Sequence, residues 1–246
     1  MRDIIYSTAN ESKMIKAIQR AVGALDNGVI GCQTLSDLAI KFKCDCFPLT
    51  LMIYGCPTII ANDIIACDPD SSVKPYENSI SGSFTYPSSG KPCSILINKG
   101  RDIFSSACHA FLGKPEGVIA RYNDGSYWFG RCKTTSEIPN RKDVRWAIGG
   151  LMLGKEYNPT IEGFSGAYSD VLRKTNHTVL GVKNGMCYLI YVPNTTATSI
   201  NIMAKDKFKF DCAIMLDGGH IAAINGTETF AEINMNQYQG YVIQGV

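Results

Sequence analysis

The sequence lacks the features that direct a chain to a membrane or to nucleic acid. Its apolar run Leu49–Tyr54 is far shorter than the roughly 20 residues that a membrane-spanning helix needs. The formal net charge is only +2, and Lys and Arg form no long basic run; none follows Lys209. We therefore expect neither a membrane nor a nucleic acid among the partners.

The ten cysteines include no Cys-x-x-Cys pair. The cluster of Cys44, Cys46, Cys56 and Cys67 also lacks the paired spacing of a zinc site. We expect no metal and no cofactor, and we expect reduced, partly buried thiols, as in a protein kept in a cytosol. Disulfides are the alternative if the protein ends its life outside the cell. The N-terminus has no long apolar core behind a basic region, so we expect no secretory signal and synthesis in the cytoplasm.

Residues 1–47 are predicted to form a small helical module. Thr8 and Glu11 have the spacing of a capping box, and Ile15, Ile18 and Val22 follow at helical spacing. A turn at residues 26–28 then precedes a second candidate helix that begins near Thr34. Two such helices bury little core, so the module is not expected to be very stable alone.

This module resembles the repeat of peptidoglycan-binding modules. The matching segments are Lys16–Gly23, Asp26–Gly31 and Gln33-Thr34-Leu35. The sequence departs from that repeat by inserting Asn27 and by placing Cys32 where proline is usual. The resemblance implies binding to a cell-wall glycan; the alternative is a helical cap packed on the main domain without glycan contact.

Residues 48–246 are predicted to form one α+β domain, a mixed, largely antiparallel sheet with a few helices. Turn signals at 123–125 and 184–185 each join two apolar, strand-like runs and predict hairpins. Further strands are expected at 79–84, 93–97, 144–150 and 212–216. Helical spacing predicts helices over 103–112 and 199–208, the second capped by Thr198.

The stretch from Phe210 to Gly226 is the strongest candidate for a functional site. An apolar run ends at Asp217-Gly218-Gly219, where adjacent glycines permit left-handed backbone angles and close approach of a ligand to the amides. A tight strand connection with a solvated Asp is the alternative interpretation of this spacing.

Four segments in order make residues 59–246 similar to the phosphodiester glycosidase family. They are Ser81-Gly82-Ser83-Phe84, Ala147-Ile148-Gly149-Gly150, His177–Gly181 with the Asn184-Gly185 turn, and Asp211–Ile221. The resemblance implies a hydrolase that cleaves a glycosyl phosphodiester. Such chemistry needs a phosphate-binding site and a carboxyl group for acid/base or nucleophilic steps.

The resemblance implies Asp217 and His177 as catalytic residues. The implied ligand-binding residues are Ser81, Gly82, Arg145, Gly149, Gly150, Thr178, Gly218, Gly219 and His220. Arg145 has an alternative role as a solvated strand residue, and His220 has one as a surface residue. Because His177 stands where the family has Arg, only its protonated ring would supply a charge, and anion binding is expected to weaken as that ring loses its proton.

Ser81, His177 and His220-Ile221 depart from the family pattern and leave open whether catalysis survives. The alternatives to a hydrolase are a non-catalytic binder of a phosphodiester-linked sugar or nucleotide, and a structural particle component. The expected partner is accordingly a phosphorylated sugar, a nucleotide-like molecule or a cell-wall glycan, with self-association left open. By analogy with phage lytic proteins, the site of action would be the cytoplasm of an infected bacterium or the cell wall.

Overall fold

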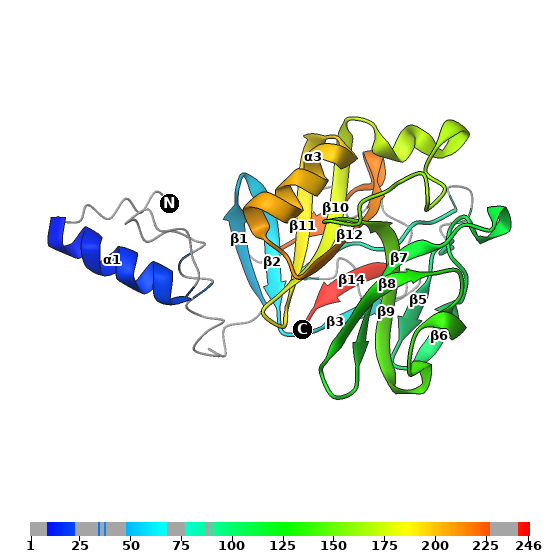
Figure 1. Cartoon of the computed structure of the whole chain (residues 1–246), viewed down its shortest axis with the longest axis horizontal. Helices are drawn as coiled ribbons and strands as arrows, with labels where there is room; N and C mark the ends of the chain where they lie inside the picture. The colour runs from blue at the N-terminus through cyan, green and yellow to red at the C-terminus, as the bar shows by residue number, and fades with distance from the viewer. Residues whose placement is uncertain are drawn as a thin grey trace.

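The computed structural model describes residues 9–22, 34, 37, 48–67, 77–86, 89, 91–226 and 241–246. The strands among these residues form two antiparallel sheets (Figure 1). In the ten-stranded sheet, the order is β1 (Leu49–Ile53), β2 (Cys56–Ala61), β11 (Met186–Thr195), β10 (Thr175–Lys183), β12 (Cys212–Gly218), β9 (Val144–Met152), β5 (Leu96–Asn98) and β6 (Arg101–Phe104). The hairpin of β7 (Glu116–Tyr122) and β8 (Tyr127–Cys132) also joins it through β9.

The second sheet has four short strands taken from distant parts of the chain. Their order is β13 (Ile224–Asn225), β4 (Ser79–Ser81), β14 (Val242–Gly245) and β3 (Ile64–Cys67). Strand β14, close to the C-terminus, pairs with both β3 and β4. This pairing closes the small sheet against residues from the first third of the chain.

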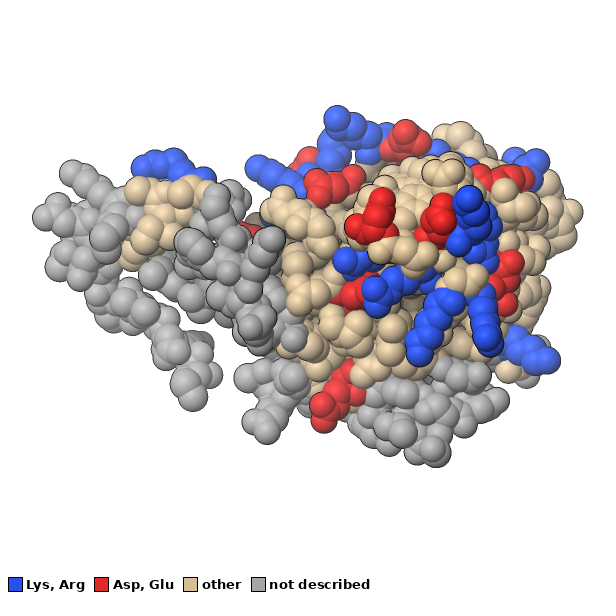
Figure 2. All heavy atoms as spheres, turned by 90° about the horizontal axis from the view of Figure 1, so that it is seen from below, with Lys and Arg blue, Asp and Glu red and all other residues tan. Residues whose placement is uncertain are grey.

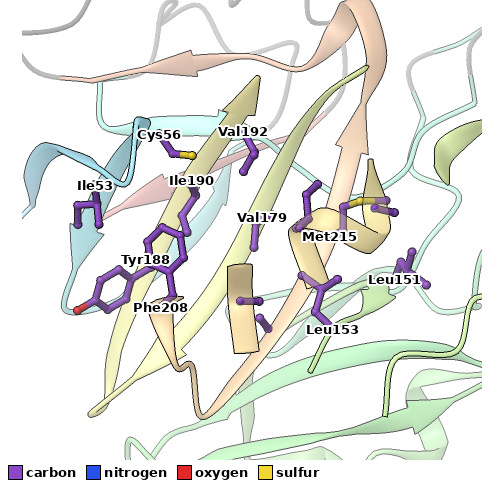
Figure 3. Packing of buried hydrophobic residues seen from close by; sticks show 14 of the residues in the cluster. Ile53, Cys56, Leu151, Leu153, Val179, Tyr188, Ile190, Val192, Phe208 and Met215 are labelled. Carbon is purple, nitrogen blue, oxygen red and sulfur yellow. The ribbon is translucent and has the colours of Figure 1, made fainter. Parts of the chain in front are cut away.

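Alternation along the central strands divides the core between the two faces of the large sheet. Val179 and Ile190 face a cluster that also contains Ile200 and Phe208, whereas their neighbours Leu180 and Leu189 face a cluster shared with the small sheet. Helix α3 (Ala197–Ile202) lies over β10 and β11 (Figure 1) and is followed by the π-helical turn η5 (Met203–Phe208); both contribute buried residues to the first cluster, part of which Figure 3 shows. Both faces of the central strands are therefore buried, which explains their nearly continuous apolar sequences.

The sheet-dominated α+β class, both hairpins and the strand at residues 144–150 are confirmed. Helix α3 is capped by Thr196, whose Oγ1 accepts a hydrogen bond from the Ser199 amide, and the prediction of Thr198 as cap is wrong. Thr196 has the extended backbone that an N-cap residue requires, whereas Thr198 lies within the helix.

The predicted helix over residues 103–112 is wrong. Its first residues belong to β6, and its last form the 3₁₀ turn η1 (Ala110–Leu112). Ile103 and Phe111 are exposed, so the apolar residues that suggested a buried helical face do not share one environment. Pairing with β5 fixed one end of the segment as a strand, and the 3₁₀ turn fixed the other end, although the spacing of the apolar residues favoured a helix.

Helix α1 (Ala9–Val22) covers the first helix predicted for residues 1–47, whereas the helical module as a whole stays a prediction. Ile15 is buried on it while Ile18 is exposed, and the buried Gln19 amide donates to Thr34 Oγ1 at 2.9 Å. Thr34 and Asp37 are helical and buried. The remainder of the second predicted helix, the capping residue Thr8 and the turn at 26–28 lie outside the described residues.

Among the described residues, no helix is long and apolar enough to cross a membrane. Figure 2 shows one face of the molecule, where acidic and basic side chains alternate over the surface. All seven cysteines in the described part of the chain are free thiols.

Candidate functional site

Asp217 lies where β12 emerges from the sheet, between the buried Leu216 and the glycine pair. Its side chain is partly exposed. Thr85 Oγ1 donates to Asp217 Oδ2 at 2.8 Å, and the Gly218 amide donates to Oδ1 at 2.9 Å. Burial nevertheless raises the pKa of Asp217 to about 6, against the opposing effect of these hydrogen bonds. The carboxyl therefore changes protonation state close to neutral pH.

The backbone around Asp217 is held by two other strands. Its amide donates to the Gly82 carbonyl at 3.1 Å. Thr178 Oγ1 lies 2.8 Å from the Asp217 carbonyl oxygen and 3.2 Å from that of Ser81. The Ser81 hydroxyl accepts a hydrogen bond from the Ala223 amide at 3.2 Å. Ser81 and Thr178 are fully buried, so their hydroxyl groups position the strands that present Asp217.

Glycine is required at both positions of the pair, for different reasons. A Cβ on Gly218 would lie 2.9 Å from the Asn176 carbonyl oxygen and 3.0 Å from His177 Nδ1, so the close approach of β10 excludes a side chain. Gly219 has φ +76°, a left-handed conformation, as the glycine pair predicted. The chain can therefore turn sharply into η6 (Gly219–Ile221) beside the carboxylate. The side chain of His220 lies outside the described residues.

His177 stands directly opposite Gly218 in the register of β10 and β12. It is buried, and its Nε2 lies 3.0 Å from the Thr195 carbonyl oxygen and 3.2 Å from that of Arg173. Because carbonyl oxygens only accept, Nε2 carries the hydrogen. Burial lowers the pKa of His177, so the ring is neutral at pH 7 and supplies no charge to the site.

Arg173 is a cation that the sequence motifs did not identify. It is exposed at the end of the 3₁₀ segment η4 (Gly166–Leu172), and its charge contributes to the lowered pKa of His177. A positive charge is thus close to the ring that faces Gly218. In the sequence, Arg173 is marked only by its position four residues before His177. That spacing predicts a contact in a helix but not in a loop.

Gly149 and Gly150 lie on β9, which pairs with β12 just before Asp217. A Cβ on Gly150 would lie 2.5 Å from the Met215 carbonyl oxygen, and one on Gly149 would collide with the Glu116 carboxylate. The two glycines therefore permit close packing of β9. Arg145 lies four residues from Gly149, roughly 13 Å along an extended strand, and it forms an ion pair with Asp63 at 2.8 Å. The structure does not bring Arg145 to the Asp217 end of the sheet.

A second carboxylate, Glu116, lies in the interior on this side of the sheet. It is fully buried and accepts hydrogen bonds from the Ser94 hydroxyl, the Ile95 amide and the Cys108 amide at 2.6–2.9 Å. Burial raises the pKa of Glu116 to about 8 despite these donors. Because it has no exposed surface, Glu116 holds the surrounding segments together and does not face a ligand.

Buried hydroxyl and thiol groups complete the surroundings of Asp217. The Ser83 hydroxyl is buried and has no hydrogen-bond partner in the described part of the chain. Cys93 and Cys108 lie with their sulfur atoms 3.7 Å apart, and the charges of Glu116 and Asp217 both raise the pKa of Cys108. Asp217, Thr85 and Cys108 come from three separate segments, and their proximity is a consequence of the fold. No group of three or more His, Cys, Asp or Glu side chains in the described part of the chain is arranged to hold a metal ion.

No protein-family model matches this sequence, and no curated protein sequence matches it. Among solved structures, it is similar to the zebrafish N-acetylglucosamine-1-phosphodiester alpha-N-acetylglucosaminidase catalytic domain auto-inhibited by its pro-peptide. The TM-score is 0.55 at 14% identity, covering 80% of this chain and 81% of that one. The two chains share a fold.

A hypothetical protein from Synechocystis gives a TM-score of 0.47 at 13% identity, over 80% of this chain and 60% of that one, and we base no argument on it. The likeness to the zebrafish catalytic domain agrees, at the level of the fold, with the resemblance carried by residues 59–246. The peptidoglycan-binding likeness of residues 10–43 has no such support and stays a prediction.

Proposed function

We propose that this protein is a hydrolase that cleaves the bond between a sugar and a phosphodiester, with Asp217 as the reacting carboxylate. The observation that carries the proposal is the state of Asp217: a partly exposed carboxyl at a strand end whose pKa lies at about 6. A group that titrates near the working pH is suited to proton transfer or to nucleophilic attack. The fold shared with a phosphodiester glycosidase catalytic domain supports this choice of reaction.

A single exposed carboxylate is sufficient for this chemistry because of the leaving group. Glycosidases that release an alcohol pair an acid with a base or nucleophile, since an alkoxide must be protonated as it departs. Cleavage of the sugar C1–O bond in a glycosyl phosphodiester instead releases a phosphate monoester, whose second pKa is about 6. That group leaves as a stable anion. Asp217 is then needed in its ionised form, either to activate water or to attack the anomeric carbon.

The phosphate would be held by Arg173 together with backbone amides near Gly219. Arg173 is exposed, and its charge acts on His177, which faces Gly218. Arginine binds phosphate through two parallel hydrogen bonds, which lysine does not reproduce. In this arrangement His177 is a positioning residue. Its Nε2–H donates to the carbonyl oxygens of both Arg173 and Thr195 and so holds their two segments together. Its ring packs against Gly218.

The test is turnover of a simple glycosyl phosphodiester, such as the methyl diester of N-acetylglucosamine 1-phosphate, by the purified full chain. Release of free sugar is expected from the wild type. It is expected to fall by roughly 10²- to 10⁴-fold in Asp217→Asn, with the exposed Asp143→Asn as the matched control. A wild type that releases no sugar from N-acetylglucosamine, N-acetylgalactosamine or glucose diesters would contradict the proposal.

A non-catalytic binder is the second candidate, and the neutral state of His177 favours it. The family has an arginine at this position, and here the ring is uncharged and committed to two carbonyl oxygens. A binder would show a ligand-dependent rise in melting temperature with the same diesters, without sugar release. In that case Asp217→Asn would alter affinity alone. A protein that neither binds nor cleaves them would instead be a structural component.

A further inference from the structure

Cys93 and Cys108 are the one pair of described cysteines whose sulfur atoms are in contact, at 3.7 Å. Cys93 is buried and Cys108 is partly buried. A disulfide has a sulfur–sulfur distance of about 2.05 Å, so bonding requires these atoms to approach by roughly 1.6 Å. Side-chain rotation within the two segments supplies movements of this size.

The two cysteines lie on separate segments, and both segments are close to Asp217. Cys93 follows Pro92, which bridges to Thr85, and its amide donates to the Phe84 carbonyl at 2.9 Å. Thr85 is the residue that donates to the Asp217 carboxylate. Cys108 is fixed from the other side, through its amide and Glu116.

We propose that Cys93 and Cys108 are a redox-modification site and form a reversible disulfide that joins their two segments beside Asp217. The oxidant would be a hydroperoxide. One thiol loses its proton and, as the thiolate, attacks the peroxide oxygen; the O–O bond breaks to give a sulfenic acid and a hydroxide, which takes up the lost proton to become water. The second thiol then attacks the sulfenic sulfur and expels a second water, which leaves the S–S bond. Two thiols and one hydrogen peroxide thus become one disulfide and two waters, and a dithiol reductant reverses the change.

The surroundings make this pair slow to oxidise. The contact with Cys93, burial, and the charges of Glu116 and Asp217 all raise the pKa of Cys108, which lowers the fraction of thiolate. Cys187 and Cys212 provide an internal comparison. Both stand opposite Val182, on the two sides of β10, so two inter-strand spacings of about 4.8 Å separate them and no disulfide can form.

The disulfide would alter the site through its geometry. It would close a loop of residues 93–108, which contains β5 and β6, and tie the Thr85 segment to the Cys108 segment. Movement of Thr85 changes the hydrogen bond that fixes Asp217 Oδ2. The oxidised protein is therefore expected to be more stable and to differ in ligand affinity or turnover from the reduced one.

The experiment treats the purified full chain with hydrogen peroxide, blocks the remaining thiols with iodoacetamide, and maps disulfides by mass spectrometry of a non-reduced digest. A cross-link between the peptides of Cys93 and Cys108 is expected, and dithiothreitol should remove it. The melting temperature should rise by roughly 5–10 °C on oxidation and return on reduction. Neither readout depends on turnover, so failure of the proposed hydrolase leaves this test intact.

Cys93→Ala and Cys108→Ala should each abolish the cross-link and the stabilisation, whereas Cys187→Ala should retain both. If either alanine variant misfolds, judged by circular dichroism, the serine variant at that position replaces it. The wild-type digest alone is also decisive. Sulfenic or sulfinic acid on single cysteines without a cross-link, or a cross-link between other cysteines, would overturn the proposal.

Discussion

Asp217 combines hydrogen bonds that favour its ionised form with burial that disfavours it, and the burial is the larger effect. Because the mechanism proposed above needs the carboxylate, kcat/KM is expected to rise with pH up to about 6 and to level off above it. Asp217→Asn should abolish this rise together with most of the rate. His177→Gln retains an N–H donor for the two carbonyl oxygens and should leave the pH profile in place, because the rise comes from the Asp217 carboxyl and burial lowers the pKa of His177. If Asp217→Asn keeps the pH dependence of kcat/KM, or if His177→Gln loses it, a group other than Asp217 is responsible for the rise.

Arg173 is expected to act on phosphate binding. Arg173→Ala should raise KM, or the dissociation constant in a binding assay, by about tenfold or more, since a hydrogen bond to a charged group contributes about 1.5–3 kcal/mol. Lys174→Ala removes the neighbouring exposed cation and is the matched control. Equal effects of the two variants would indicate general electrostatic attraction and remove Arg173 from a specific role.

Glu116 makes stability depend on pH in a direction opposite to that of a paired surface carboxylate. With its pKa raised to about 8, the folded state holds the Glu116 proton more tightly than the unfolded state does. The stability that Glu116 contributes is therefore fully present below the pKa of Glu116 in the unfolded chain. It falls as pH rises from about 5 to 8, by at most about 1.4 kcal/mol per pH unit. Urea unfolding of Glu116→Gln across this range should show a shallower fall, at lower overall stability, because an amide nitrogen would face a backbone N–H. Glu77→Gln, at an exposed carboxylate, should keep the wild-type slope.

The candidate site could be predicted only in part, and the residues show why. Asp217, Gly218 and Gly219 were identified because strand, carboxylate and glycine pair are adjacent in the sequence. Thr85 reaches the Asp217 carboxylate only through the fold, and Arg173 lies in a loop beside His177, so no local pattern marks either residue. Ser81 and Thr178 were identified by resemblance, but their burial in backbone hydrogen bonds became visible only in the fold.

At the scale of elements, the hairpins were predictable because each has its turn signal between two apolar runs. The order of the strands was not, since β9 pairs with β5, β7 and β12 through contacts between distant segments. The 103–112 segment shows the same limit. Its first residues pair with β5 and its last residues form η1, and the spacing of its apolar residues did not reveal either conformation. Local chemistry determined the turns, and non-local pairing determined the sheet.

The contact between β9 and β12 depends on the absence of a side chain at Gly150. A Cβ there would lie 2.5 Å from a backbone oxygen of Met215, which has no rotamer to change. Gly150→Ala should therefore force the strands apart and lower the free energy of unfolding by about 1–3 kcal/mol. Chemical denaturation measures the loss, with the exposed Lys142→Ala as control. Wild-type stability in Gly150→Ala would show that β9 can shift without cost, and that the packing beside Asp217 is looser than the geometry indicates.

At the scale of the whole molecule, the buried apolar core in the described part of the sheet domain is built from residues of that domain. The four buried apolar clusters of the described residues contain no member before Ile53. Strand β1 begins at Leu49 and pairs along its length with β2, which itself pairs with β11. Residues 49–57 of the predicted junction therefore belong to the β1–β2 hairpin, and the division of the chain near residue 48 stays a prediction.

Limited trypsin digestion should accordingly cut first at Lys41 or Lys43, which precede the first strand pairing, and should release a stable fragment that contains residues 48–246. Backbone within a paired strand reaches a protease only after local unfolding, and β9, β10 and β11 each lie between two other strands of the sheet. The variant with Lys41→Gln and Lys43→Gln should lose this early cut while keeping the wild-type melting temperature. A first cut within 118–192, at Arg131 in β8 or at the exposed turn residue Lys155, would show that the sheet domain is cleaved before the N-terminal module separates, and the division of the chain near residue 48 would then be wrong.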